Sequence, residues 1–345
     1  MVEKDINLKE AVLWEALEGK KVQCFLCNHR CLIAEGKVGF CRVRKNIDGT
    51  LYSLNYNIIV AANPDPIEKK PLFHFQPGSR SFSIAAPGCN FRCQFCQNWQ
   101  ISQVDLATER IGVQRSEPES IVEAAKRNNC KSIAYTYTEP TVFMELAEDC
   151  ARIAKQNGLM NVFVSNGYMT IEAVEFAKEW LDAINVDLKA FTEDYYKKLC
   201  RSRLSPVRET IRHIAKQTGI WLEITTLLVP GQNDSDEELT KLAEFIVEAA
   251  GPGVPWHVSR FYPNYKYLDS AATSAATLER AMEIGKKAGL WYVYVGNLPG
   301  SKAESTFCHS CDELLIERVG YRIIVNRVKN SKCPKCGVTV RGIQM

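Results

Sequence analysis

SFSIAAPGCNFRCQFC, residues 81–96, joins an apolar run directly to three cysteines. The run, residues 81–86, has the length of a buried strand, and the Pro87-Gly88 pair after it marks a turn. The thiols follow in CxxxCxxC spacing at Cys89, Cys93 and Cys96. Such close packing of soft ligands suits an iron–sulfur cluster, because its irons need sulfur atoms that converge on one small volume. Three buried cysteines without a ligand are the alternative.

Three thiolates would leave one iron of such a cluster open to another ligand. A zinc ion would need a fourth protein ligand, and the closest histidine in the sequence is His74. We therefore expect an iron–sulfur cluster with one open iron at the end of a strand.

Apolar runs of strand length continue beyond the trio and alternate with amphipathic stretches that begin at capping residues and end at glycine or polar turns. With the first run, they span residues 81–86, 132–137, 161–165, 183–188, 221–229, 256–261 and 291–295. This pattern predicts an α/β fold in which six or seven parallel strands form a partial, TIM-like (β/α)6 barrel. The carboxyl ends of such strands form the ligand-binding edge.

Small cysteine-rich, metal-binding modules are predicted on both sides of the barrel. We expect residues 1–75 to hold an N-terminal helix and a four-cysteine module, residues 76–300 the barrel, and residues 301–345 a C-terminal module. The first 20 residues are predicted to form a surface helix with inward-facing side chains at Leu8, Trp14 and Leu17.

The C-terminal thiols form two CxxC pairs, which are typical of a tetrahedral zinc-ribbon or rubredoxin-like site. They lie at Cys308, Cys311, Cys333 and Cys336. Zinc is the predicted metal, with iron as the alternative. The N-terminal thiols are Cys24, Cys27, Cys31 and Cys41. A second zinc is predicted there, with an auxiliary iron–sulfur cluster as the alternative.

The composition of the 345 residues, 46% hydrophobic and 24% charged, indicates a globular protein and excludes a disordered or collagen-like chain. Fourteen cysteines are too few for a disulfide scaffold of this length. The sequence shows no secretory leader and no apolar stretch long enough to span a membrane, so we expect a cytoplasmic protein with free thiols.

Basic residues are concentrated at the C-terminal end. From Glu317 onward the chain carries a local charge of +6, although its total is only +3. A solvated basic surface is one interpretation, and an acidic partner such as RNA is the other.

The sequence resembles the radical S-adenosylmethionine superfamily, whose members hold a [4Fe-4S] cluster on CxxxCxxC after the first strand of a (β/α)6 barrel. More narrowly, it is similar to the radical enzymes of the AmmeMemoRadiSam system, relatives of the activating enzymes for pyruvate formate-lyase and other glycyl-radical enzymes. The resemblance spans nearly the whole chain. It rests on CFLCNHRC, GFCRVR, DPIEKKPLFHF, GCNFRCQFCQNWQIS, YTYTEPTVF, NVDLKAF, LLVPGQND, SRFYPNY and YVYVGN.

This resemblance implies an enzyme of the oxidoreductase class that binds S-adenosylmethionine at the open iron. An electron from a flavodoxin- or ferredoxin-type donor would cleave the cofactor to methionine and a 5′-deoxyadenosyl radical, which abstracts hydrogen from a substrate. The implied substrate is a glycyl-radical protein, another macromolecule such as RNA, or a small molecule handled with partner proteins of the system.

Glu139 falls where the superfamily carries a Gly-Gly-Glu segment, so the resemblance implies contact with the methionine ammonium. Tyr137-Thr138 replaces the two glycines. The residue also begins a predicted helix with Pro140 at its first turn, and an ordinary helix-start acid is the alternative.

Asp187 and Lys189 are two residues apart on a predicted strand and therefore share one face, which we expect to be the barrel mouth. The resemblance implies that Lys189 approaches the methionine carboxylate, that Asp187 lies at a cation site and that Ser165 supplies a hydroxyl at the end of the third strand. A plain salt bridge between Asp187 and Lys189 is the alternative.

Three further residues complete the predicted cofactor site. His257 alternates with Val258 and would face inward toward the carboxylate, or serve as a core histidine. Phe95 and Asn98 match positions that contact adenine in relatives. Shielding of the cluster from water is the alternative for Phe95.

Two other classes of function explain less of the sequence. A metal-ribbon protein that binds nucleic acid would leave the central trio and the barrel without a role. A metal-dependent hydrolase would need a His/Asp/Glu cluster at the strand ends, and the chain has only five histidines.

Overall fold

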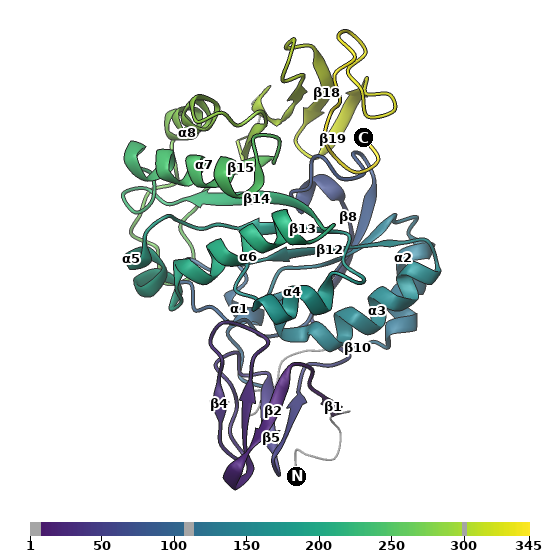
Figure 1. Ribbon diagram of the computed structural model, residues 1–345, viewed down its shortest axis with the longest axis vertical. Helices are drawn as coiled ribbons and strands as arrows, with labels where there is room; N and C mark the ends of the chain where they lie inside the picture. Colours follow the sequence, from purple (N-terminus) through teal and green to yellow (C-terminus); the bar gives the residue numbers. More distant parts are fainter. Residues whose placement is uncertain (1–7, 107–113, 299–301) are drawn as a thin grey trace.

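The computed structural model describes residues 8–106, 114–298 and 302–345. An eight-stranded sheet forms its centre (Figure 1), with the strand order β16-β15-β14-β13-β12-β11-β9-β8. Seven strands run parallel, and β8 pairs antiparallel with β9 at one edge. The bounds are β8 (Ala61–Pro66), β9 (Arg80–Ala85), β11 (Ser132–Tyr135), β12 (Met160–Ser165), β13 (Ala183–Asp187), β14 (Trp221–Leu228), β15 (Trp256–Arg260) and β16 (Val293–Gly296).

All seven predicted apolar runs form one parallel strand each, so the predicted α/β fold with a parallel-sheet core is confirmed. Strand β8 escaped prediction because it contains Pro64 and Pro66. Proline cannot donate a ladder hydrogen bond, and strands therefore tolerate it mainly at a sheet edge, where β8 lies.

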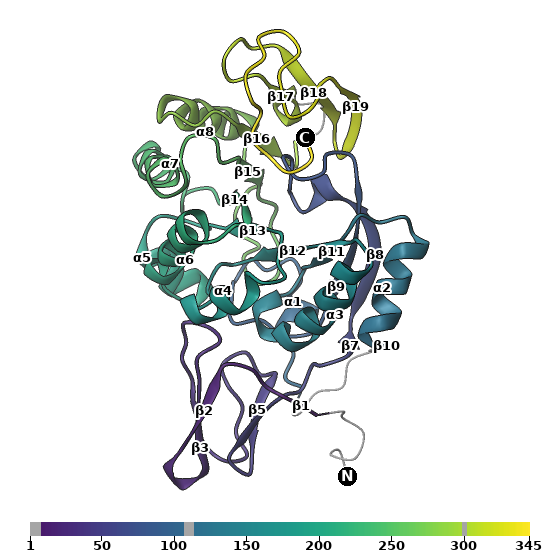
Figure 2. The ribbon, with the colours of Figure 1, turned by 45° about the vertical axis from the view of Figure 1, so that its right-hand side comes forward.

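Helices connect the parallel strands and cover the outer face of the sheet (Figure 2). The longer ones are α2 (Pro118–Arg127), α3 (Met144–Gln156), α4 (Ile171–Ala177), α6 (Leu204–Gln217), α7 (Asp236–Ala250) and α8 (Ala275–Lys287). Shorter turns are α1 (Trp99–Ser102), η2 (Ile67–Lys69), η3 (Pro140–Phe143), α5 (Glu193–Tyr195) and the π-helical turn η4 (Tyr196–Cys200). Polar side chains cap several starts; Ser235, for example, accepts a hydrogen bond from the Glu238 amide.

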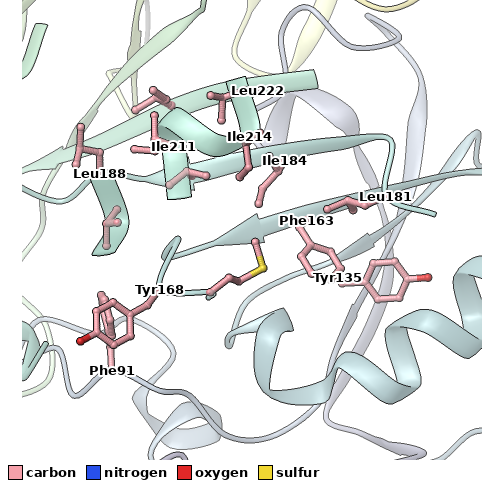
Figure 3. Packing of buried hydrophobic residues seen from close by; sticks show 14 of the residues in the cluster. Phe91, Tyr135, Phe163, Tyr168, Leu181, Ile184, Leu188, Ile211, Ile214 and Leu222 are labelled. Atoms are coloured by element: carbon pink, nitrogen blue, oxygen red, sulfur yellow. The ribbon is translucent and has the colours of Figure 1, made fainter. Parts of the chain in front are cut away.

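The main hydrophobic core lies between the sheet and these helices (Figure 3). Phe163 and Ile184 on neighbouring strands are fully buried, as are Ile211 and Ile214 on α6. Each such side chain contributes about 1.5–3 kcal/mol on burial. This packing fixes the strand ends on which the polar residues described below are placed.

The N-terminal module consists of β-strands, so the predicted helix over the first 20 residues is wrong within residues 8–20; residues 1–7 lie outside the described part. Its sheets have the orders β2-β3-β4 and β1-β6-β5. The bounds are β1 (Lys9–Glu10), β2 (Trp14–Leu17), η1 (Glu18–Lys20), β3 (Lys21–Cys24), β4 (Leu32–Ile33), β5 (Arg44–Ile47) and β6 (Thr50–Ser53). Strand pairing of β2 with β3 overrides the helical periodicity, and Leu8 and Leu17 are exposed rather than inward.

A buried ion pair fastens this module to the barrel. The Arg44 guanidinium donates to the Glu145 carboxylate on α3, and both side chains are 1% exposed. Arg44 also donates to the Val12 carbonyl at 2.8 Å, while the Val12 amide donates to Glu145 at 2.8 Å. Although burial lowers the pKa of Arg44, the charge of Glu145 raises it above its usual value.

Replacing Arg44 with Met should destabilise the protein by about 3–5 kcal/mol, because Glu145 would remain as a buried, unpaired charge. Urea denaturation under reducing conditions measures the change. The exposed pair Arg212–Glu248 provides the control, and Arg212→Met should cost less than about 1 kcal/mol. Equal losses in the two variants would contradict this role for Arg44.

The C-terminal module bridges the two edges of the open sheet (Figure 2). It contains η5 (Lys302–Glu304), β17 (Thr306–Phe307), β18 (Leu314–Val319) and β19 (Arg322–Asn326). Beside the β16 edge, the Tyr294 hydroxyl lies 2.8 Å from Thr306 Oγ1. Beyond β8, residues 74–76 exchange backbone hydrogen bonds of 2.8 Å with Ile343.

Six of the seven C-terminal basic residues are exposed. The exception is Arg318, which is 2% exposed and donates to the Phe73 carbonyl at 2.9 Å. The basic segment is therefore partly structural.

Within the described ranges, no helix is both long enough and apolar enough to cross a bilayer. Strand β7 (Ile58–Ile59) pairs with β10 (Gln114–Arg115) outside these layers.

Candidate active site

A cavity of about 320 Å³ lies at the carboxyl ends of β9 and β11–β14. All three thiols of the central trio line it. So do Lys69, Lys70, Phe95, Asn98, Tyr137, Glu139, Asn166, Asp187, Lys189 and Leu227. Most of the predicted cofactor residues are thus brought to one place by the ends of successive parallel strands.

The trio loop is held by backbone contacts on both sides. Arg92 and Gln94, which flank Cys93, donate their amides to the carbonyls of Cys200 and Leu199 at 2.9 Å each. At its start the loop passes close under the N-terminal module. Gly88 has φ +103°, and a Cβ there would lie 2.6 Å from a methyl group of Val43. Only glycine permits both this conformation and this close approach.

The donor set fits a cluster with three protein ligands. Cys93 is 8% exposed, and Cys89 and Cys96 are partly buried. In the described part of the chain, the trio supplies every cysteine that lines the cavity. Burial raises the pKa of Cys89 and Cys96, and a hydrogen bond with Cys200 together with burial raises that of Cys93. Bound irons would supply the positive charge that thiolates need here.

Glu139 is almost fully buried, at 1% exposure, and collects four hydrogen bonds. Oε1 accepts from the Thr141 amide, the Thr141 hydroxyl and the Ser165 hydroxyl at 3.1, 2.5 and 2.8 Å. Oε2 accepts from the Asn166 amide at 2.8 Å. Burial raises the pKa of Glu139, and these hydrogen bonds oppose the rise. The residue is both the cap of η3 and a wall of the cavity.

Replacing Glu139 with Gln should weaken binding of S-adenosylmethionine by about 1.5–3 kcal/mol through loss of a charge-assisted contact. Iron loading should not change. Calorimetry on the iron-loaded protein measures the affinity, and Thr141→Val controls for disturbance of the cap. An unchanged affinity would show that Glu139 is only a helix-start acid.

Asp187 and Lys189 line the cavity as an ion pair of 2.9 Å, whereas Val186 and Leu188 are fully buried on the other face. Burial lowers the pKa of Lys189, but the charges of Asp187 and of the nearby thiols outweigh it and raise that pKa above its usual value. Asp187 and Lys189 therefore do form the salt bridge that was the alternative prediction, and this salt bridge lines the same cavity as the three thiols.

The adenine-side residues also lie at this cavity. Phe95 is 4% exposed and lines the wall, with the ring of Tyr195 at 6.0 Å. Asn98 donates to the Tyr137 carbonyl at 2.9 Å. Ser165 is placed behind Glu139 rather than on the cavity surface.

Tyr137, where the superfamily has glycine, takes a glycine-like backbone conformation with φ +69°. Its hydroxyl donates to Asp65 at 2.7 Å. Asp65 also accepts from Lys69 at 2.9 Å and from Lys70 at 2.8 Å. Sequence reasoning missed this group, although the string DPIEKKPLFHF contains three of its members.

His257 does not line the trio cavity. Its Nε2 lies 2.6 Å from Glu223 Oε2, and both side chains are buried. Although burial favours a higher value, the hydrogen bond to His257 lowers the pKa of Glu223. His257 instead lines a neighbouring cavity, so its predicted contact with the cofactor carboxylate stays a prediction that this arrangement does not favour.

The C-terminal thiols converge as a metal site requires. Their sulfur atoms lie within 4.8 Å of one another, with Cys308–Cys336 and Cys311–Cys333 separations of 3.6 and 3.8 Å. Across residues 8–106, 114–298 and 302–345, this is the only group of at least three candidate ligands so closely placed. Within the same ranges the four N-terminal thiols do not form such a group, so the zinc predicted there stays a prediction.

Comparisons with known proteins identify the family of the chain. Residues 83–243 match the model of the Radical SAM superfamily. The chain is 45% identical over 332 residues to the uncharacterized protein MJ0808 of Methanocaldococcus jannaschii, covering 96% of this chain and 98% of that protein. It is 28% identical to the pyruvate formate-lyase-activating enzyme of Listeria monocytogenes over 49% of this chain and 70% of that enzyme.

Among solved structures, a radical SAM methyltransferase from Sphaerobacter thermophilus aligns with a TM-score of 0.48 and 18% identity, covering 64% of this chain and 67% of that one. The chain belongs to the radical SAM superfamily. The predicted family is therefore confirmed at this level, and the narrower AmmeMemoRadiSam assignment stays a prediction.

Proposed function

We propose that the protein reductively cleaves S-adenosylmethionine at a [4Fe-4S] cluster held by Cys89, Cys93 and Cys96. The observation that carries the proposal is the cavity in which these thiols meet Glu139 and the Asp187–Lys189 pair. When bound, the cluster and the cofactor would supply methionine and a 5′-deoxyadenosyl radical, which takes a hydrogen atom from a substrate.

The protein's own residues bind and orient the cofactor. Lys189 supplies a positive charge for a carboxylate, and Glu139 a negative charge for an ammonium. Phe95 and the Asn98 amide form the wall to which the adenine is assigned. The N-terminal module packs closely against the start of the trio loop, where a Cβ at Gly88 would lie 2.6 Å from Val43.

Reduction requires a one-electron donor, for which a flavodoxin or ferredoxin is proposed. Zinc is proposed for the C-terminal thiols, because their spacing and convergence match a closed tetrahedral site. A second zinc at Cys24, Cys27, Cys31 and Cys41, an oxidoreductase class and a cytoplasmic location also stay proposals.

A small molecule is one class of candidate substrate, and two classes of macromolecule are the others. A glycyl-radical enzyme is favoured by the 24% identity to a protein of Methanocaldococcus jannaschii named as a putative glycyl-radical enzyme activating enzyme. RNA follows from the exposed basic residues of the C-terminal module.

Anaerobic reconstitution with iron and sulfide, followed by reduction with dithionite, tests the proposal. We expect four irons per chain at the trio and equal amounts of methionine and 5′-deoxyadenosine from added S-adenosylmethionine. Cluster assembly without any cofactor cleavage would contradict it.

A further inference from the structure

A second cavity, of about 590 Å³, adjoins the cofactor cavity inside the barrel. Lys69 lines both cavities. Thr225 in the second cavity and Leu227 in the first are two residues apart on β14 and therefore lie on the same face of the sheet. A molecule in the second cavity would thus be a neighbour of the cofactor.

Aromatic rings form much of the wall of this second cavity: Phe73, His257, Tyr262, Tyr294 and Tyr321. The Phe73 ring lies 4.8 Å from that of His257 and 4.7 Å from that of Tyr294. The volume of the second cavity suits a small organic molecule. Its aromatic walls favour a ligand with a planar, apolar ring system.

The C-terminal module covers the open side of this cavity. Val319, Gly320 and Tyr321, at the turn between β18 and β19, line it directly. Arg318, next in the chain, is bonded to the Phe73 carbonyl and to Thr306 Oγ1 at 2.9 and 2.7 Å. The C-terminal module therefore forms one wall of the second cavity.

Positive charge is concentrated where the two cavities meet. Lys69 and Lys70 share the single carboxylate of Asp65, and Lys70 is only 2% exposed. Asp65 also accepts from Ser83 at 2.8 Å and from Tyr137 at 2.7 Å. Burial lowers the pKa of Lys70, whereas the hydrogen bond to Asp65 raises that of Lys69. Two lysines on one carboxylate therefore leave positive charge at this wall, and Lys69 presents it to both cavities.

Two acids, Glu68 and Glu304, also line the second cavity, and each accepts a hydrogen bond from a backbone amide. Glu68 accepts from the Gly78 amide at 2.8 Å and lies 3.8 Å from the buried Arg318 guanidinium. Glu304 accepts from the Gly320 amide at 2.8 Å. Burial raises the pKa of both carboxyl groups, while the charge of Arg318 opposes the rise.

From this arrangement we infer that the second cavity is a substrate site for a small organic anion with a planar, apolar body. Its carboxylate or other anionic group would face Lys69, and its body would lie between Phe73, Tyr294 and Tyr321. The inference rests on the proposed function, because it names the class of molecule that the 5′-deoxyadenosyl radical would attack.

Indole-3-acetate and indole-3-acetamide test this inference as probes, because they have nearly the same shape and differ in charge. Calorimetry on the reconstituted protein with S-adenosylmethionine should show at least about tenfold tighter binding of the acetate. Lys69→Met should remove that preference. Lys126→Met, which changes an exposed lysine on α2, should keep it.

Gly296→Phe should abolish binding of both probes by filling the cavity. A Cβ at Gly296 meets only ordinary contacts of 3.8 and 4.0 Å, so the backbone accepts a side chain there. Tyr321→Ala, at the exposed rim, should weaken binding if the larger variant does not fold.

Equal affinity for the two probes, an acetate preference that survives Lys69→Met, or no binding at millimolar concentration would overturn the inference. Cleavage of S-adenosylmethionine without probes is measured in parallel. If cleavage occurs and the probes fail, only the substrate site is wrong. If cleavage is absent, the proposed function fails whatever the probes show.

Discussion

Cys93→Ser should reduce formation of 5′-deoxyadenosine to background while the barrel remains folded. The thiol is 8% exposed and lies between two backbone hydrogen bonds to the segment ending at Cys200. A serine hydroxyl preserves the shape of the loop but is not the soft ligand that iron–sulfur clusters require. The chemistry should therefore be lost through the cluster and not through the fold.

Iron content, 5′-deoxyadenosine by mass spectrometry and circular dichroism measure the three parts of this prediction. Cys130→Ser is the matched control, because Cys130 is also buried, at 4% exposure, but does not line the cavity. Cleavage of S-adenosylmethionine at the wild-type rate in Cys93→Ser would contradict the assignment of the trio as cluster ligands.

Replacing Cys333 and Cys336 together by Ser should remove one bound metal and unfold the C-terminal module. That module buries only a small core of its own, formed by Leu315, Ile316 and Val340 beside the thiols. Structural zinc contributes on the order of 10–16 kcal/mol in such sites, far more than this core can replace. The Cys311→Ala variant should show the same loss in weaker form.

Metal analysis and hydrogen exchange of residues 314–326 measure the effect. Cleavage of S-adenosylmethionine without substrate should persist, because the trio lies in a different module. Binding of indole-3-acetate should fall, since Tyr321 and Arg318 hold one wall of the second cavity. Loss of uncoupled cleavage would show instead that the module belongs to the catalytic unit.

The barrel was predictable because its signals are local. Each buried parallel strand appears as an apolar run, and the polar residues after it fall at one edge of the sheet. Glu139, Asp187 and Lys189 were found in this way, and the trio by its spacing alone. Strand β2 was not predicted, because its residues have a helical pattern of apolar side chains and only their pairing with β3 makes them a strand.

The remaining site residues depend on contacts between distant segments. His257 forms a hydrogen bond with Glu223, which lies 34 residues earlier in the chain. The alternation of side chains along one strand cannot reveal a partner on another strand. Asp65, Lys69 and Tyr137 meet across 72 residues, and β8, which carries Asp65, has prolines that obscure it as a strand. The bridge formed by the C-terminal module likewise depends on residues 74–76 pairing with Ile343.

The central claim is that the trio holds a cluster whose open iron binds the cofactor. Electron–nuclear double resonance on the reduced protein, with S-adenosylmethionine labelled with ¹⁵N at its amino group, tests it most directly. We predict a nitrogen coupling that shows the amino group bound to iron, absent in Cys93→Ser and weakened in Glu139→Gln. A well-formed, reduced cluster with no coupling to the label would contradict the account.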